Sequence, residues 1–287
     1  MASSTVNVTE MTITSQAATL GNARYGATIS SLYELWQARE LLWLLVERDV
    51  KVHYREAVLG IAWAILTPLL FMVVLTLIFG VMGRMGPVKH PYPVFLFPAW
   101  LTWNYFNSTS NRGANSLMRN SSLITRIYIP RLLFPLANAI SPFVDLAIGM
   151  VVLSGLLIYY GYYPTWRVVF VPFFLLLAMF CALGVSTLLG ALNARYRDIR
   201  HVLPVLMRIW FFCTPVIYHI ERIPEKWHNL YALNPMVTVM IGLRWCFIGM
   251  EPPTIVMVTE AIVFIMLLLF VGMIVFRYLE KTVTDVL

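Results

Sequence analysis

The sequence predicts an all-α integral membrane protein with six transmembrane helices. Of its 287 residues, 60% are hydrophobic and only 12% are charged, whereas soluble chains are about 45–50% apolar and about 25% charged. The apolar residues form long blocks, and those at 57–83, 90–111 and 168–194 contain no Asp, Glu, Lys or Arg. Each block exceeds the roughly 20 helical residues that cross a hydrocarbon core of about 30 Å. A soluble enzyme, a nucleic-acid-binding protein and a secreted disulfide scaffold are therefore excluded as main interpretations.

The chain begins with a polar tail and continues with an amphipathic segment. Residues 1–30 are rich in Ser, Thr, Ala and Asn and lack the basic start and apolar core of a secretory signal. We expect them to form a disordered cytosolic tail. From residue 31 apolar residues, tryptophans among them, recur at helical spacing, which predicts an interface helix at the level of the lipid headgroups. The membrane domain then occupies residues 31–287.

Charge asymmetry orients the predicted spans. They cover about residues 58–82, 92–114, 132–160, 168–192, 201–219 and 254–276. Basic residues before the first span, between the second and third, after the fourth and after the sixth lie on one side. They outnumber those on the other side, so the positive-inside rule places both termini in the cytosol.

Residues 221–251 do not fit the alternation of spans and short loops. They are too long for a tight turn, and their central part is too short and too polar to span. Asn234 precedes Pro235, and this dipeptide breaks a helix. Were the segment to span, Arg277 and Lys281 would lie outside, against the charge rule. We predict a re-entrant helix pair at the outer face, a backbone that needs surrounding protein or a water-filled cavity.

Residues 103–116, in the inner half of the second span, are mostly amides and hydroxyls. Unpaired groups of this kind are costly in hydrocarbon, so they must face other helices or water. Small and hydroxylated residues also let helices pack closely, and this alternative stays open. The run is longer and richer in amides than packing requires, which favours a hydrated translocation route.

Aromatic residues are concentrated in the first, second and fifth spans. An interfacial belt and core packing are their ordinary roles, yet several tryptophans lie well inside their spans. Aromatic faces also favour the C–H faces of sugar rings, so a pore lined in this way would hold a sugar chain loosely. The predicted substrate path comprises Trp63, Phe71, Trp100, Trp103, Asn104, Tyr105, Phe106, Asn107, Trp210, Phe211, Phe212 and Tyr218.

Two ionisable residues fall inside predicted spans: Asp145 in the third and Arg208 in the fifth. A charge at the bilayer centre costs roughly 2.5–3.5 kcal/mol on insertion scales. A buried pair between the two, or a proton relay, would explain them. The cysteines and histidines show no metal-binding spacing, so no metal site is predicted.

Residues 120–131 follow the second span and predict a short capped helix. Asn120 or Ser121 can accept hydrogen bonds from its first amides, and Pro130 ends it. Its apolar edge, which includes Leu123 and Ile124, is typical of a docking helix rather than a plain connection.

Several motifs in order resemble the permease subunits of polysaccharide-exporting ABC transporters. They are residues 40–55 (ELLWLLVERDVKVHYR), 59–63 (LGIAW), 67–69 (TPL), the 120–130 loop, 195–199 (RYRDI), 214–218 (TPVIY) and 233–236 (LNPM). The resemblance covers about residues 31–280. It implies a homodimer in the cell inner membrane that exports a lipid-linked polysaccharide of the O-antigen, teichoic-acid or capsule type, together with two copies of an ATPase subunit.

The resemblance also assigns roles to residues. The coupling helix that contacts the ATPase would contain Asn120, Ser121, Ser122, Leu123, Ile124, Arg126, Tyr128 and Pro130. The outer gate would contain Pro224, Trp227, Asn234, Pro235 and Arg244. This chain has no G-x-x-x-x-G-K-[ST] motif, so it is expected to carry no cofactor, and ATP and Mg²⁺ are expected on the partner.

Arginines near the inner face could attract a lipid pyrophosphate. Arg48, Arg55 and Arg119 are the candidates, although such charges more commonly set topology. A proton-coupled secondary transporter of a glycolipid or other amphiphile is the alternative function, but we find no convincing internal repeat and few intramembrane acids. A membrane-embedded transferase would need paired acids or a metal cluster, and neither is apparent.

Overall fold

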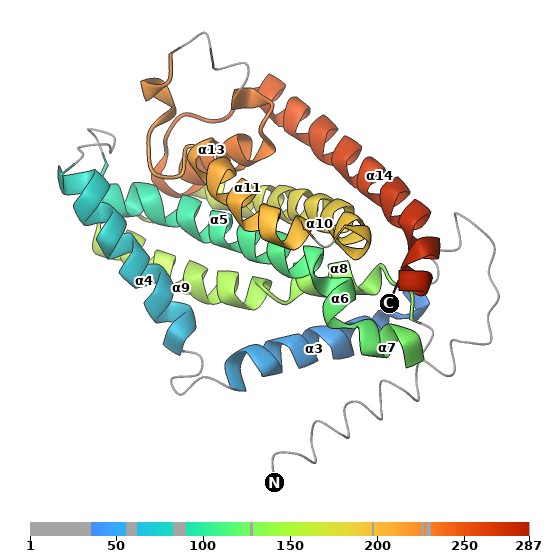
Figure 1. Ribbon diagram of the computed structural model, residues 1–287. Helices are drawn as coiled ribbons and strands as arrows, with labels where there is room; N and C mark the ends of the chain where they lie inside the picture. Colours follow the sequence, from blue (N-terminus) through green and yellow to red (C-terminus); the bar gives the residue numbers. More distant parts are fainter. Residues whose placement is uncertain are drawn as a thin grey trace.

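A computed structural model describes residues 36–55, 62–82, 90–126, 129–196, 198–224, 227 and 231–286. Over these residues the chain is helical and contains no strand (Figure 1), so the predicted all-α class is confirmed. The predicted tail, residues 1–30, lies outside the described residues. Helices long and apolar enough to cross a membrane cover Ile65–Met82, Leu133–Tyr159, Trp166–Arg195 and Ile255–Leu279. The protein is thus a multi-pass membrane protein.

Helix α5 (Tyr92–Ala114) occupies the centre of the molecule. Its bounds coincide with those predicted for the second span. It contacts α4 (Ala62–Leu75), α9 (Phe143–Tyr159), α10 (Val171–Arg195) and other helices, as Figure 1 shows. Because neighbours surround it, most of its apolar side chains are buried in the main core.

The helix of the third predicted span is interrupted at one point, although the two parts together are long enough to cross a membrane. Helix α8 (Leu133–Ile140) ends before Ser141 and Pro142, and α9 begins at Phe143. Proline lacks the amide that would continue the ladder of an incoming helix and is well tolerated at a helix start. The break places Asp145 in the first turn of α9, where the sequence had suggested the middle of a span.

The other spans differ from the predicted ones mainly in where their helices begin and end. Helix α4 continues as the π-helical segment η1 (Thr76–Met82), and the 3₁₀ segment η2 (Trp166–Phe170) leads into α10. Helix α14 (Ile255–Val286) lies along α10 and is longer than the predicted sixth span. Helix α11 (Ile199–Phe212) is shorter than the predicted fifth span.

Helix α3 (Arg39–Arg55) corresponds to the predicted interface helix. It extends through the charged residues 47–55. Its buried face includes Leu41 and Leu45 and belongs to a second core with Phe134 of α8 and Phe276 of α14. Figure 1 shows α3 next to α7 (Ser121–Arg126), outside the bundle of longer helices.

Between α11 and α14 lie the one-turn η3 (Ile220–Arg222) and helix α13 (Pro235–Ile248). Most α13 side chains are buried against α5, α10, η2 and α14. Such surroundings meet the condition for non-spanning backbone at membrane depth.

Candidate translocation and coupling sites

The polar half of α5 has one face packed against α10. Thr109 and Ser110 are fully buried. The Ser186 hydroxyl donates to the Thr109 carbonyl at 3.1 Å, and the Asn193 amide donates to the Ala114 carbonyl at 3.0 Å. Along this face the small and polar residues serve helix packing, as the alternative interpretation held.

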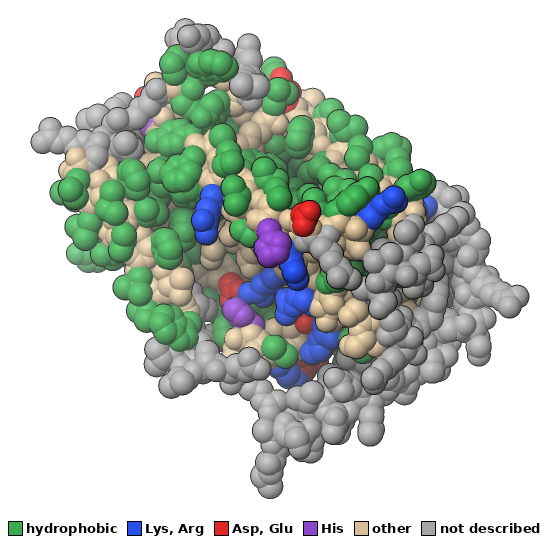
Figure 2. All heavy atoms as spheres, in the orientation of Figure 1, with side chains coloured by type: hydrophobic (Ala, Val, Ile, Leu, Met, Phe, Trp, Pro, Cys, Tyr) green, Lys and Arg blue, Asp and Glu red, His purple; other side chains and the backbone are tan. Residues whose placement is uncertain are grey.

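Other residues of the same half-helix border two cavities. The first has a volume of about 540 Å³ and is lined by Asn111, Arg112, Asn115, Met118, Arg119, Asn193 and Arg200. The second has about 410 Å³ and is lined by His53, Tyr54, Trp63, Thr67, Pro68, Leu101, Asn104, Tyr105, Ser108, Arg112, Pro142, Asp145 and Leu146. Figure 2 shows Lys or Arg, His and acidic side chains gathered in one region of the surface, with hydrophobic side chains around it. The inner end of α5 therefore adjoins open space, which the predicted hydrated route requires.

Aromatic residues predicted to line the path meet where α4, α5 and α11 approach one another. Phe71 stacks on Trp100 with ring centroids 4.7 Å apart. Phe211 contacts Trp100 at 6.0 Å and Trp103 at 5.5 Å, and Phe106 contacts Trp210 at 5.1 Å. The structure thus joins residues separated by more than a hundred positions into one aromatic cluster.

Members of the predicted path differ in exposure. Trp63, Phe71, Asn104 and Phe212 are exposed, and Asn107 is half-buried, its side chain accepting from Asn111. Trp103, Tyr105 and Phe106 are buried.

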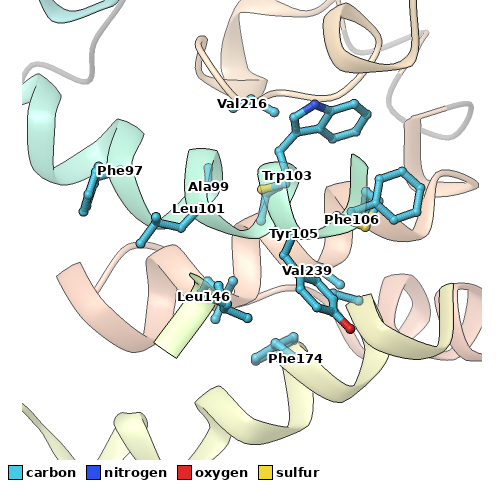
Figure 3. Close-up of a cluster of buried hydrophobic side chains, with 14 of the residues drawn as sticks. Phe97, Ala99, Leu101, Trp103, Tyr105, Phe106, Leu146, Phe174, Val216 and Val239 are labelled. Carbon is cyan, nitrogen blue, oxygen red and sulfur yellow. The ribbon is translucent and has the colours of Figure 1, made fainter. Parts of the chain in front are cut away.

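Trp103 and Tyr105 point to opposite sides of α5 (Figure 3). The Tyr105 hydroxyl donates to the Ala139 carbonyl at 2.7 Å, and the Tyr218 hydroxyl donates to the Phe212 carbonyl at 2.7 Å. These two hydroxyls hold backbone in place.

Asn234 is a junction of the predicted outer gate. Its Oδ1 accepts from the Met236 amide, so it caps α13, and from the Trp210 indole, both at 3.1 Å. Its Nδ2 donates to the Thr214 hydroxyl at 2.9 Å. Pro235 occupies the first turn of α13. The cap therefore ties α13 to the end of α11.

The other predicted gate residues are Arg244, Pro224 and Trp227. Arg244 is buried and donates to the Phe95 carbonyl at 3.2 Å and the Val216 carbonyl at 2.8 Å. Pro224 and Trp227 are exposed. Arg244 holds backbone segments together from inside the protein.

Asp145 pairs with α3, and the predicted pair between Asp145 and Arg208 is wrong. Tyr54 donates to Asp145 Oδ1, and His53 Nε2 lies 3.7 Å from Asp145 Oδ2. Arg208 is exposed on α11. The carboxylate, in the first turn of α9, therefore faces the end of α3. Burial, followed by the hydrogen bond to Asp145, raises the pKa of Tyr54, which keeps its phenol protonated as a donor.

The predicted coupling segment forms the short helices α6 (Ser116–Arg119) and α7, joined at Asn120. The Asn120 side chain accepts from Arg48 at 2.9 Å and donates to the Ser116 carbonyl at 2.8 Å, so it links α3 to α6. Ser122 is exposed, and Ser121, Leu123 and Pro130 are half-buried. Tyr128 and the side chains of Ile124 and Arg126 lie outside the described residues.

The three predicted pyrophosphate arginines differ in their surroundings. Arg48 is engaged by Asp49 at 2.9 Å and by Asn120, whereas Arg119 is exposed and lines the first cavity. The side chain of Arg55 is not among those described. No three His, Cys, Asp or Glu side chains gather as a metal site in the part of the chain that the structure describes.

Several residues that line the cavities were not predicted from the sequence, namely His53, Tyr54, Asn193 and Arg200. They lie on helices other than α5, and only packing shows that they share a space with it. A possible signal was the tight grouping of basic and aromatic residues in 48–55 and 195–200.

Comparison with known proteins gives consistent results. A family model described as "ABC-2 type transporter" matches residues 40–248. The chain is 32% identical over 216 residues, 75% of its own length and 82% of the relative, to the O-antigen export system permease protein RfbA of Myxococcus xanthus. It is 28% identical over 224 residues, 77% and 85% of the two chains, to a Klebsiella pneumoniae protein of the same name. It is 23% identical over 239 residues, 82% and 91%, to the polysialic acid transport protein KpsM of Escherichia coli.

Proposed function

Because the chain belongs to the ABC-2 type transporter family, we propose that it is the permease subunit that exports a lipid-linked, O-antigen-like polysaccharide. Membership makes it a membrane transport subunit rather than an enzyme, and it is paired with a separate ATPase. Two relatives are O-antigen export permeases and a third is a polysialic acid transport protein. Their names support a polysaccharide as the transported substrate.

The proposal includes six spans in the inner membrane with both termini in the cytosol. Helices α5 and α11 would join the four long apolar helices as spans. Their polar and aromatic residues would then lie at membrane depth, where such residues are expected to be functional. Helix α13 would be part of the re-entrant outer gate, with Asn234 as its cap.

A homodimer would enclose the pathway, with the exposed aromatic residues of α4 and α11 facing it. An ATPase subunit would dock on α7 of each copy, and ATP and Mg²⁺ would bind there, leaving this chain without a cofactor. The link from Arg48 to Asn120 would let α3 follow the movement of the coupling segment.

The observation that carries the proposal is the pair of cavities beside the polar half of α5. The first cavity contains three arginines, and none of its described lining residues is acidic. Guanidinium groups bind phosphate oxygens in bidentate geometry. A lipid pyrophosphate would therefore be held by Arg112, Arg119 and Arg200, and Arg48 would have a structural role.

The test is export by the chain and its ATPase reconstituted in proteoliposomes with lipid-linked polysaccharide. Asn111→Leu keeps the branched shape of the side chain but removes the amide that lines the first cavity and donates to Asn107, and export is expected to fall about tenfold or more. Ser110→Ala changes a buried hydroxyl on the same helix and is expected to export normally. Export by Asn111→Leu at the wild-type rate would refute the proposed route.

A further inference from the structure

The second cavity holds hydrogen-bonding groups that nothing in the described structure uses. Thr67, Asn104 and Ser108 line it, and their side chains have no hydrogen-bond partner among the described residues. Thr67 lies on the otherwise largely apolar α4, and Asn104 and Ser108 lie on the polar half of α5. A polar group there is costly unless water or a ligand satisfies it. Thr67 and Asn104 are exposed and Ser108 is half-buried, so all three are open to water or to the hydroxyl groups of a ligand in this cavity.

One wall of this cavity is an indole without a partner ring. Trp63 lines the cavity, is 46% exposed and makes no ring contact among the described residues. The aromatic cluster described above does not include it. An aromatic face favours the weakly positive C–H groups of a sugar ring and leaves the ring's hydroxyls free. Trp63 therefore provides a stacking surface beside the three polar groups.

Charge distinguishes the second cavity from the first. Asp145 lines the second cavity beside His53 and Tyr54, and a carboxylate repels an anionic ligand. The first cavity has three arginines and no acid among its described lining residues. Arg112 lines both cavities. The two spaces therefore suit different parts of one ligand, an anionic group and a neutral hydroxylated group, which meet at Arg112.

We propose that the second cavity is a subsite for the sugar adjoining the diphosphate of the exported molecule. Trp63 stacks on the ring, and Asn104, Ser108 and Asp145 bind its hydroxyls. Its volume of about 410 Å³ lies within the usual range of about 300–1,000 Å³ for small-molecule pockets. This inference rests on the proposed function and deepens it. The subsite would select for a sugar at the point where the lipid-linked molecule enters.

Two soluble probes test the subsite: farnesyl diphosphate and the same molecule carrying one N-acetylglucosamine. Their Kd values are measured with the chain and its ATPase in nanodiscs. The wild type is expected to bind the sugar-bearing probe about tenfold more tightly. Trp63→Ala and Asn104→Ala remove that preference and leave the Kd for farnesyl diphosphate within about twofold. Trp63→Phe retains a ring and most of the preference, which separates loss of stacking from misfolding.

Trp43→Ala is the matched control, because Trp43 is an exposed indole on α3 outside both cavities. It is expected to keep the wild-type preference. If Trp63→Ala binds both probes as the wild type does, or weakens both equally, the sugar subsite is refuted while the proposed function stands. If the wild type binds neither probe, the proposed lipid-linked substrate itself is refuted.

Discussion

Substitution of Gly113 by alanine tests the close packing of α5 on α10. A Cβ at this position would lie 2.4 Å from both Cβ and Oγ of Ser186, whereas ordinary contacts of a Cβ atom are 3.4–4 Å. The helices must therefore separate by about 1 Å, and overpacking of this kind costs about 1–3 kcal/mol. Alanine also favours a helix interior by about 1 kcal/mol over glycine. The control Gly155→Ala has nothing within 4 Å of its new Cβ. It therefore gains the higher helix propensity of alanine without a steric clash.

The assay is thermal unfolding of the purified chain in detergent. Gly113→Ala is expected to unfold about 5 °C below Gly155→Ala, at about 2–4 °C per kcal/mol for chains of this order of size. Ser186→Gly removes the atoms that clash, so the double variant Gly113→Ala, Ser186→Gly is expected to recover part of the loss. Equal midpoints for the two alanine variants, or no recovery in the double variant, would refute the close-packing argument.

Three further predictions concern coupling and the outer segment. Leu123→Asp places a charge on the apolar edge of α7, and we expect the ATPase subunit no longer to co-purify and its ATP hydrolysis no longer to be stimulated. Stimulation of ATP hydrolysis at the wild-type level would count against docking on α7. Arg48→Ala leaves the mostly buried Asn120 carbonyl oxygen without its donor, at a cost of about 1–3 kcal/mol in unfolding free energy; an unchanged denaturant midpoint would contradict this. Asn234→Ala removes the cap and the Trp210 bond, at a cost of about 2 kcal/mol. Unaltered indole fluorescence and stability would show that the cap does not hold α13.

Much of the fold was predictable because membrane insertion depends on local properties of the sequence. Hydropathy and length identified the apolar helices, and residues 92–114 coincide with α5. The amphipathic pattern after residue 31 identified α3, although the helix runs on to Arg55. Each of these features depends on a short window of residues, so no knowledge of distant contacts was needed.

The amino-acid order alone places amides and hydroxyls in α5 that must be satisfied in a membrane, and aromatic residues beside them. Which of these polar residues pack against protein and which border open space depends on how the helices assemble. Ser186 and Asn193 of α10 approach one face, while Asn104 and Asn111 remain at the cavities. The partner of Asp145 was likewise decided by packing, which brings Tyr54 of α3 to the carboxylate at the start of α9. A polar side chain is chemically the same whether it packs against a helix or lines a cavity. The distance to its neighbours therefore determines whether protein or water satisfies its hydrogen bonds.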